Sequence, residues 1–169
     1  MIHLIGSLLV TGVCLWAGWS RRQWLRRRRQ TLSDFCHALA RMETELSEHE
    51  TDTADLLALM SSGTGRAEPF FRRCVAGLEQ RDYTPLCKIW SEAAETCDLP
   101  LKADERSLLE RGGRLLGRYD GRAQAMLLAQ LRRDMERCLE TAREEERREG
   151  KTAVLLGLTA GLITVLMLN

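Results

Sequence analysis

The chain has 169 residues, of which 25 are basic and 24 acidic, so its formal net charge is only +1. A nucleic-acid-binding protein needs a basic excess, and this balance argues against that class. Aromatic residues make up only 5% of the chain and β-branched residues are few, which disfavours strands, whereas abundant Ala, Leu, Arg, Glu and Gln favour helices. We therefore predict an all-α fold, a bundle of about six helices between an N-terminal and a C-terminal transmembrane helix.

Residues 1–20 form the first apolar segment and carry no formally charged side chain when His3 is neutral. As a helix that rises about 1.5 Å per residue, the segment is roughly 30 Å long, which matches the hydrocarbon core of a bilayer. Trp16, Trp19 and Trp24 near its end are typical of a membrane interface. We predict a transmembrane anchor over residues 1–20 that is not cleaved, because the layout is the reverse of a signal peptide.

A run of arginines follows this segment directly. Basic residues that flank a span stay on the cytoplasmic side, so we expect the N-terminus outside and residues 21–151 in the cytoplasm. Because the run adjoins a predicted span, anionic lipid is a better partner for it than nucleic acid. The run comprises Arg21, Arg22, Arg26, Arg27, Arg28 and Arg29.

Residues 21–151 are predicted to form one cytoplasmic helical domain. A long helix continues from the first segment to about Glu50, and a short second helix covers Thr53–Ser61. Pro69 lies near the first turn of a third helix, and Thr84-Pro85 opens a fourth.

A fifth helix is expected around Leu108, Leu109, Leu115 and Leu116, interrupted by Gly112-Gly113. The glycine pair either permits close helix approach or a partner groove, or it kinks the helix locally. After a turn at Tyr119-Asp120-Gly121 comes the longest pattern, a heptad-like seam along the last helix. The seam comprises Gln124, Leu128, Leu131, Met135, Cys138 and Ala142.

Residues 152–168 carry no formal charge and would reach about 26 Å as a helix, which suits a short span. We assign residues 152–169 to a C-terminal transmembrane anchor; the alternative is a buried core helix. Gly157 and Gly161 form a GxxxG pattern, which lets two membrane helices approach closely. The partner helix is either the first span, where Ser7 and Thr11 are small, or another protein.

No catalytic, cofactor or metal site is predicted, so we expect a protein that is not an enzyme. The stretch Gly63–Arg66 resembles a phosphate loop only faintly, because it lacks the Lys-Ser/Thr pair and a preceding strand. Cys36 and His37 are neighbours on a helix and diverge by about 100°, so they do not form a nucleophile–base pair. The six cysteines show no ligand spacing with the histidines and are expected to be small core residues. A group of acidic residues is either a patch for a basic partner or a solvated face; it comprises Glu43, Glu45, Glu48 and Glu50.

Taken together, these features resemble the stage III sporulation protein AB family over the whole length of the chain. The resemblance lies in the opening Met1–Gly6, an acidic pair beside an aliphatic residue, a tryptophan in the middle helices, and Leu-Leu…Gly-x-x-Leu-Gly followed by Asp and Gln. The matching residues are Gly6, Leu39, Glu43, Glu45, Leu46, Trp90, Leu108, Leu109, Gly113, Leu116, Gly117, Asp120 and Gln124. The chain departs from the family at Thr53–Leu56, where a Pro-Leu is usual, and at His49, near which an aromatic often stands.

The resemblance implies a component of the channel-like, secretion-like complex between mother cell and forespore. It implies a fold similar to the helical cytoplasmic domain of type II secretion and type IV pilus platform proteins. The chain would then be a non-enzymatic scaffold in the mother-cell membrane facing the forespore. Its partners would be a secretion-type ATPase, other membrane components of the complex, membrane lipids and further copies of itself as a homo-oligomer.

Six residues are expected either to form the partner surface or to brace it: Glu43, Glu45, Leu116, Gly117, Asp120 and Gln124. Asp120 could equally accept the free N–H groups at the start of the last helix. An alternative function is a membrane-anchored regulatory module that binds a soluble cytoplasmic factor and is unrelated to sporulation. A third is a membrane enzyme with a cysteine nucleophile.

Overall fold

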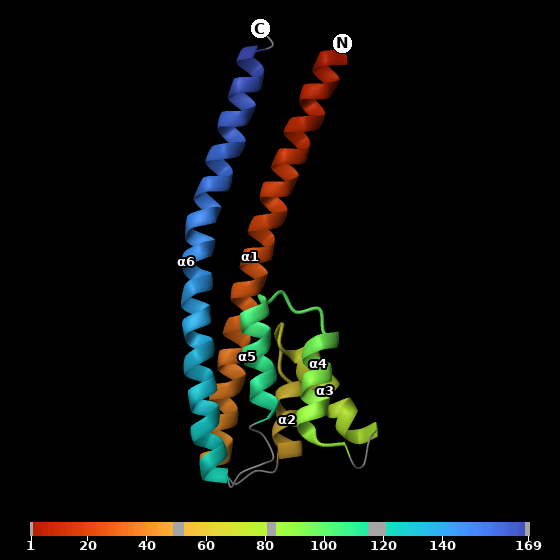
Figure 1. Ribbon diagram of the computed structural model, residues 1–169, viewed down its shortest axis with the longest axis vertical. Coiled ribbons are helices and arrows are strands. Elements are labelled where there is room, and N and C mark those ends of the chain that lie inside the picture. The colour runs from red at the N-terminus through yellow and green to blue at the C-terminus, as the bar shows by residue number, and fades with distance from the viewer. Residues whose placement is uncertain (1, 49–52, 81–83, 115–120, 168–169) are drawn as a thin grey trace. The chain divides into compact units, whose positions relative to one another are not determined.

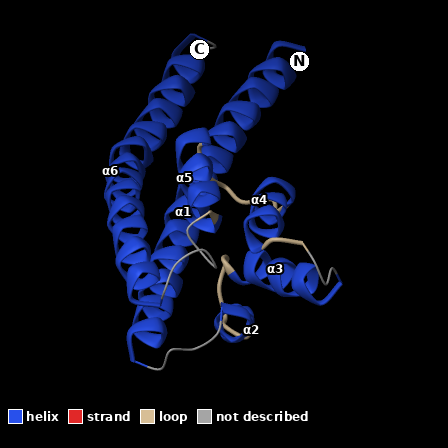
Figure 2. Cartoon of the chain, turned by 60° about the horizontal axis from the view of Figure 1, so that its bottom comes forward, coloured by secondary structure: helices blue, strands red, loops and turns tan. Residues whose placement is uncertain are grey.

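The computed structural model describes the backbone of residues 2–48, 53–80, 84–114 and 121–167. It describes the side chains of residues 12–13, 16–48, 53–80, 84–114 and 123–149. Within these ranges the regular structure is all helical: α1 (Ile2–Glu48), α2 (Thr53–Ser61), α3 (Glu68–Gln80), α4 (Leu86–Thr96), α5 (Ala103–Gly113) and α6 (Gly121–Met167) (Figures 1 and 2). The predicted all-α fold of about six helices is therefore confirmed for the described residues.

The helix boundaries follow from local sequence signals. The first helix ends at Glu48, close to the predicted Glu50, and α2 has the predicted bounds. Pro85 is the residue before α4, with extended backbone angles (φ −61°, ψ 139°), and Pro69 is the second residue of α3. Proline suits these positions because the first turn of a helix does not use its N–H groups.

The chain divides into two compact units, and both long helices contribute to both. Unit 1 consists of residues 1–29 and 141–169, the outer portions of α1 and α6. Unit 2 consists of residues 30–140 and contains α2 to α5. Among the residues described in full, no helix has a stretch long and apolar enough to cross a membrane. The predicted span 152–168, and most of the predicted span 1–20, lie outside the residues whose side chains are described.

An aromatic cluster forms the centre of unit 2. Phe35 of α1, Phe70 and Phe71 of α3 and Trp90 of α4 are all at most 2% exposed. Their ring centroids lie 4.8 Å apart for Phe70 and Trp90 and 5.4 Å apart for Phe35 and Phe70, in edge-to-face arrangements. Such pairs are each worth about 0.5–1.5 kcal/mol beyond the burial of their area. The cluster thus joins α1, α3 and α4 around one apolar centre.

Trp90 also ties α4 to α5. Its indole Nε1–H donates a hydrogen bond of 2.7 Å to the backbone carbonyl of Leu109, and the whole side chain is inaccessible to solvent. A buried indole N–H needs such an acceptor, because leaving it unpaired costs about 1–3 kcal/mol. This bond therefore fixes where α5 lies along α4.

The glycine pair in α5 allows this close packing. A Cβ on Gly113 would lie 2.5 Å from Cγ and Cδ1 of Trp90, and one on Gly112 would lie 2.6 Å from Cδ2 of Leu131 in α6. Of the two readings of the pair, the structure thus supports close helix approach. The sequence suggested that the pair interrupts the helix. In the structure the two glycines are instead the last two residues of α5. Leu115 and Leu116, expected in the same helix, lie outside the described residues.

The connection from α4 to α5 is held by two charged side chains. The carboxylate of Glu105, only 1% exposed, accepts a hydrogen bond of 2.8 Å from the backbone N–H of Lys102 at the start of α5. The guanidinium of Arg106 donates to the carbonyl of Ala94 at 2.6 Å and to that of Leu99 at 3.3 Å. The bonds at Lys102 and Ala94 satisfy backbone groups that the helix ends leave without partners, and the bond to Leu99 holds the connection itself.

The seam of α6 is confirmed at five of its six predicted positions. Gln124, Leu128, Leu131, Met135 and Ala142 are at most 5% exposed. Cys138 is only half-buried, and Leu139, 6% exposed, lies on the buried face instead. The cause is the helical period: a straight helix repeats every 3.6 residues, so a strict heptad drifts by about 20° per repeat.

The described cysteines are free thiols, and three of them, Cys36, Cys74 and Cys97, are buried among apolar side chains. This confirms the expectation of small core residues for these three. Burial, followed by the nearby Cys97, raises the pKa of the Cys74 thiol to about 12. His37, beside the buried Cys36, is exposed, as expected from their positions on the helix.

Because Gly113 faces the rigid indole and Gly112 a flexible leucine end, replacing each by alanine should have unequal effects. We expect Gly113→Ala to destabilise the protein by about 1–3 kcal/mol through overpacking, despite a helix-propensity gain of roughly 1 kcal/mol. Gly112→Ala should cost less, since Leu131 can change rotamer. Thermal unfolding of the detergent-solubilised chain, followed by circular dichroism, measures both; equal losses would contradict this packing.

The raised pKa of Cys74 predicts a loss of stability in alkali. Its neutral thiol is favoured by the fold, so the stabilisation is complete below the ordinary thiol pKa and is lost as the pH rises toward about 12. We expect the unfolding temperature of Cys74→Ala to fall less than that of the wild type between neutral and strongly alkaline pH. Cys87→Ala, at a half-buried position of α4, is the control and should follow the wild type.

Candidate functional site

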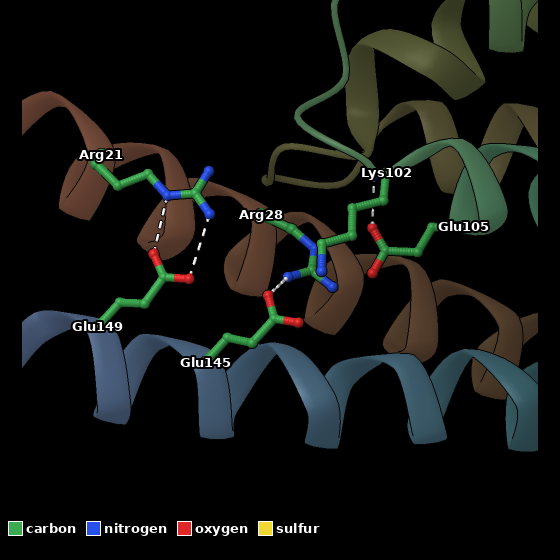
Figure 3. Close-up of polar contacts among 6 residues, drawn as sticks. All are labelled: Arg21, Arg28, Lys102, Glu105, Glu145 and Glu149. Carbon is green, nitrogen blue, oxygen red and sulfur yellow. Dashed lines mark hydrogen bonds and ion pairs between the residues drawn. The ribbon is translucent and has the colours of Figure 1, made fainter.

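Unit 1 is held by ion pairs between arginines of α1 and glutamates of α6. Arg21 Nε lies 2.9 Å from Glu149 Oε2 and its Nη2 3.3 Å from Glu149 Oε1. Arg28 Nη1 lies 2.6 Å from Glu145 Oε2 (Figure 3). Arg29 Nε lies 2.6 Å from Glu146 Oε2, although this N–H is not aligned for a hydrogen bond. We call these three pairs the ladder; its order shows that the two helices run antiparallel.

The ladder differs in burial from one end to the other. The side chain of Arg28 is only 2% exposed, whereas that of Arg21 is 52% exposed. The ring of Trp24 lies beside both, 5.0 Å from the Arg21 guanidinium carbon and 5.9 Å from that of Arg28. The hydrogen bond that Arg21 donates to Glu149 is the main cause that raises the pKa of Arg21. A buried guanidinium needs such a partner, so Glu145 is the partner that allows Arg28 to be buried.

The six arginines expected to contact lipid therefore fall into two groups. Arg21, Arg28 and Arg29 form the ion pairs of the ladder. Arg22 and Arg26 are exposed, and in the described part of the chain neither makes an ion pair. Arg27 is exposed as well.

Glu43, one of the residues expected at the partner surface, is joined to α6 within unit 2. Its Oε2 lies 3.1 Å from Nε of Arg132, whose Nη1 lies 2.5 Å from Oε1 of Glu136. The hydrogen bond that Arg132 donates to Glu43 is the main cause that raises the pKa of Arg132. Arg132 thus bridges a carboxylate on each long helix, a residue that sequence reasoning had not singled out.

The remaining candidates do not gather at Glu43. Glu45 is half-buried and lies two residues further along, about 200° around the helix axis from Glu43. Gln124 is 5% exposed on the buried face of α6, which suits bracing better than partner contact. Leu116, Gly117 and Asp120 lie outside the described residues. Gly157 and Gly161 lie within α6, but their surroundings are outside the described side chains.

The glycine-containing loop at Gly63–Arg66 binds a carboxylate of its own chain. The backbone N–H of Arg66 donates to Asp34 Oδ2 at 2.7 Å, and its Nε donates to Gln30 Oε1 at 3.1 Å. A Cβ on Gly65 would lie 2.9 Å from that same Asp34 oxygen. The loop between α2 and α3 is thus held tightly to α1.

A cleft of about 280 Å³ lies beside this loop, lined by His37, Arg41, Glu68 and Phe71 among others. Across the described residues, no group of three or more His, Cys, Asp and Glu side chains could hold a metal ion. The cleft contains both charge signs and an apolar floor, so its chemistry favours no single ligand class.

Some of these interactions carried a readable sequence signal and others did not. The stretch 144–149 contains four glutamates and precedes the second apolar segment, just as the arginine run follows the first. This arrangement allows pairing between the glutamates and the arginines. The bond between Arg132 and Glu43 joins residues 89 positions apart, and the contact between Arg66 and Asp34 joins residues 32 apart. Neither of these has a periodicity or motif that marks it.

The pair of Glu43 and Arg132 can be tested by charge exchange. Glu43→Arg and Arg132→Glu should each destabilise the protein, and the double variant should recover part of the loss. We expect a coupling of about 0.5–1 kcal/mol at low salt, because both side chains are partly exposed. The coupling should shrink in high salt. Strictly additive single effects would exclude an interaction between the two.

Comparison with known proteins places the chain in a family. The family model described as stage III sporulation protein AB matches residues 3–169. No curated protein and no solved structure matches the chain. The matched range includes both long helices, the Trp90–Gly113 contact and the ladder. The chain therefore belongs to the stage III sporulation protein AB family.

Proposed function

We propose that the chain is a membrane-anchored, non-enzymatic scaffold of the secretion-like complex between mother cell and forespore. The observation that carries the proposal is the family match over residues 3–169, which gives the chain a role in sporulation and includes both of its apolar ends. In this proposal residues 1–20 and 152–168 are the anchors, held in the mother-cell membrane that faces the forespore.

The charge pattern supports this topology. The arginines after residue 20 predict that unit 2 is on the cytoplasmic side. The ladder follows the first apolar segment and precedes the second, so it lies where both helices would leave the membrane. Three ion pairs at that level would keep the two helices together against separation in water.

Contact with a secretion-type ATPase is the finer part of the proposal, and it rests on the resemblance to platform proteins of secretion systems. The all-helical unit 2 is compatible with such a role, but a fold by itself does not assign a partner. Glu45 is the candidate residue best suited to a test. It is partly exposed, and in the described part of the chain it makes no ion pair that its replacement would break.

Co-purification from sporulating membranes in mild detergent tests the ATPase contact. We expect the tagged wild type to retain the ATPase and Glu45→Lys to lose it, because a reversed charge at the interface opposes docking. Glu79→Lys, at an exposed site of α3 outside the acidic group, is the control and should retain the ATPase.

Two results would contradict this assignment. If the wild type retained other membrane components but no ATPase, the chain would be a passive scaffold. If it retained no component of the complex, the alternative of a regulatory module that binds a soluble factor would be favoured.

A further inference from the structure

Two tryptophan side chains of unit 1 are exposed to solvent. Trp16 is 68% exposed and Trp19 64% exposed, whereas Leu25, further along the same helix, is 1% exposed. Indole rings with an apolar body and one polar N–H are enriched at the boundary between lipid headgroups and acyl chains. These two side chains thus face outward from the helix pair.

Two arginines continue the same face of α1. At about 100° per residue, positions 16, 19, 22 and 26 fall within an arc of about 120° whose centre is opposite Arg28. Arg22 and Arg26 are exposed there. One turn before Trp16, a Cβ on Gly12 would meet no atom within 4 Å, so this face is open there too. We call Trp16, Trp19, Arg22 and Arg26 the outer face.

Among the residues whose side chains are described, no carboxylate neutralises the charges of the outer face. The ladder arginines each have a glutamate within 2.9 Å, so their charge is already compensated within unit 1. Arg22 and Arg26 make no such pair among the described residues. An external anion would therefore be attracted to these two side chains more strongly than to the ladder.

We infer that the outer face is a binding site for the headgroup of an anionic phospholipid, with Arg22 and Arg26 binding the phosphate and Trp16 and Trp19 covering the upper acyl chains. This inference rests on the proposed membrane anchoring. Lipid fits better than a soluble anion because the tryptophans lie in the last turns of the apolar segment, next to the arginines, so one ligand must satisfy charge and apolar area together. Arg21, Arg28 and Arg29 are not part of this site, since their charges are already paired with Glu149, Glu145 and Glu146.

The test is lipid selection by the full-length protein. The chain is reconstituted in vesicles of equimolar phosphatidylcholine and phosphatidylglycerol and re-extracted in mild detergent, and the retained lipids are measured by mass spectrometry. We expect the wild type to retain phosphatidylglycerol preferentially. Each arginine near an anionic surface contributes about fivefold, so Arg22→Gln/Arg26→Gln should lower the preference by about 25-fold.

The control removes the same charge from the ladder. Arg21→Gln/Arg29→Gln should keep the preference within about twofold of the wild type, since these arginines are already paired. Equal losses in both variants would overturn the inference in favour of a net-charge effect. A wild type without preference would overturn it as well.

Two further readouts separate the possible failures. If all variants resist alkaline extraction from the vesicles but show no lipid preference, the anchoring stands and only the lipid site is wrong. If the wild type itself is extracted, the proposed anchoring fails. If Trp16→Ala/Trp19→Ala changes the oligomeric state but not the retained lipids, the outer face is a protein interface and the lipid site is refuted.

Discussion

The hydrogen bond from the buried Trp90 indole to the Leu109 carbonyl is the constraint on which unit 2 depends. The ring lies against Phe70 and Phe71 of α3 on one side and leaves no space for a side chain at Gly113 on the other. One residue therefore links α3, α4 and α5, and through Phe35 this centre extends to α1. Leu131 of α6 packs against α5 at the adjacent Gly112. The two glycines therefore let both the indole and α6 pack closely against α5.

Charge has a different function in each unit. In unit 1 the glutamates of α6 neutralise three arginines of α1, one of them almost completely buried. In unit 2 a single arginine, Arg132, joins Glu43 of α1 to Glu136 within α6. The net charge of the chain is close to zero, but basic residues are concentrated on α1 and their acidic partners on α6 in unit 1. In our proposal, the compensated charges hold the helices together, and the uncompensated Arg22 and Arg26 are left for the membrane.

Helix positions were largely predictable, because they depend on local signals. Proline at position 85, the apolar spacing of α1 and the seam of α6 each act within one or two turns. The failures have local causes too: the seam shifts from Cys138 to Leu139 as the helical period departs from a heptad. The site was less predictable, because contacts such as Arg132 to Glu43 join distant positions. Three of the six candidate determinants, Leu116, Gly117 and Asp120, lie outside the described residues, so their placement stays a prediction.

The central claim, that both ends of the chain are membrane anchors and unit 2 is cytoplasmic, is tested most directly by labelling cysteines in sealed inverted membrane vesicles with a membrane-impermeant maleimide. The reporters are Ser62→Cys, in the exposed loop after α2, and Asn169→Cys. The account predicts that Ser62→Cys adds labelling to sealed vesicles and that Asn169→Cys adds labelling only after detergent opens them. Labelling of both in sealed vesicles, or extraction of the protein by alkali, would contradict the two-anchor topology.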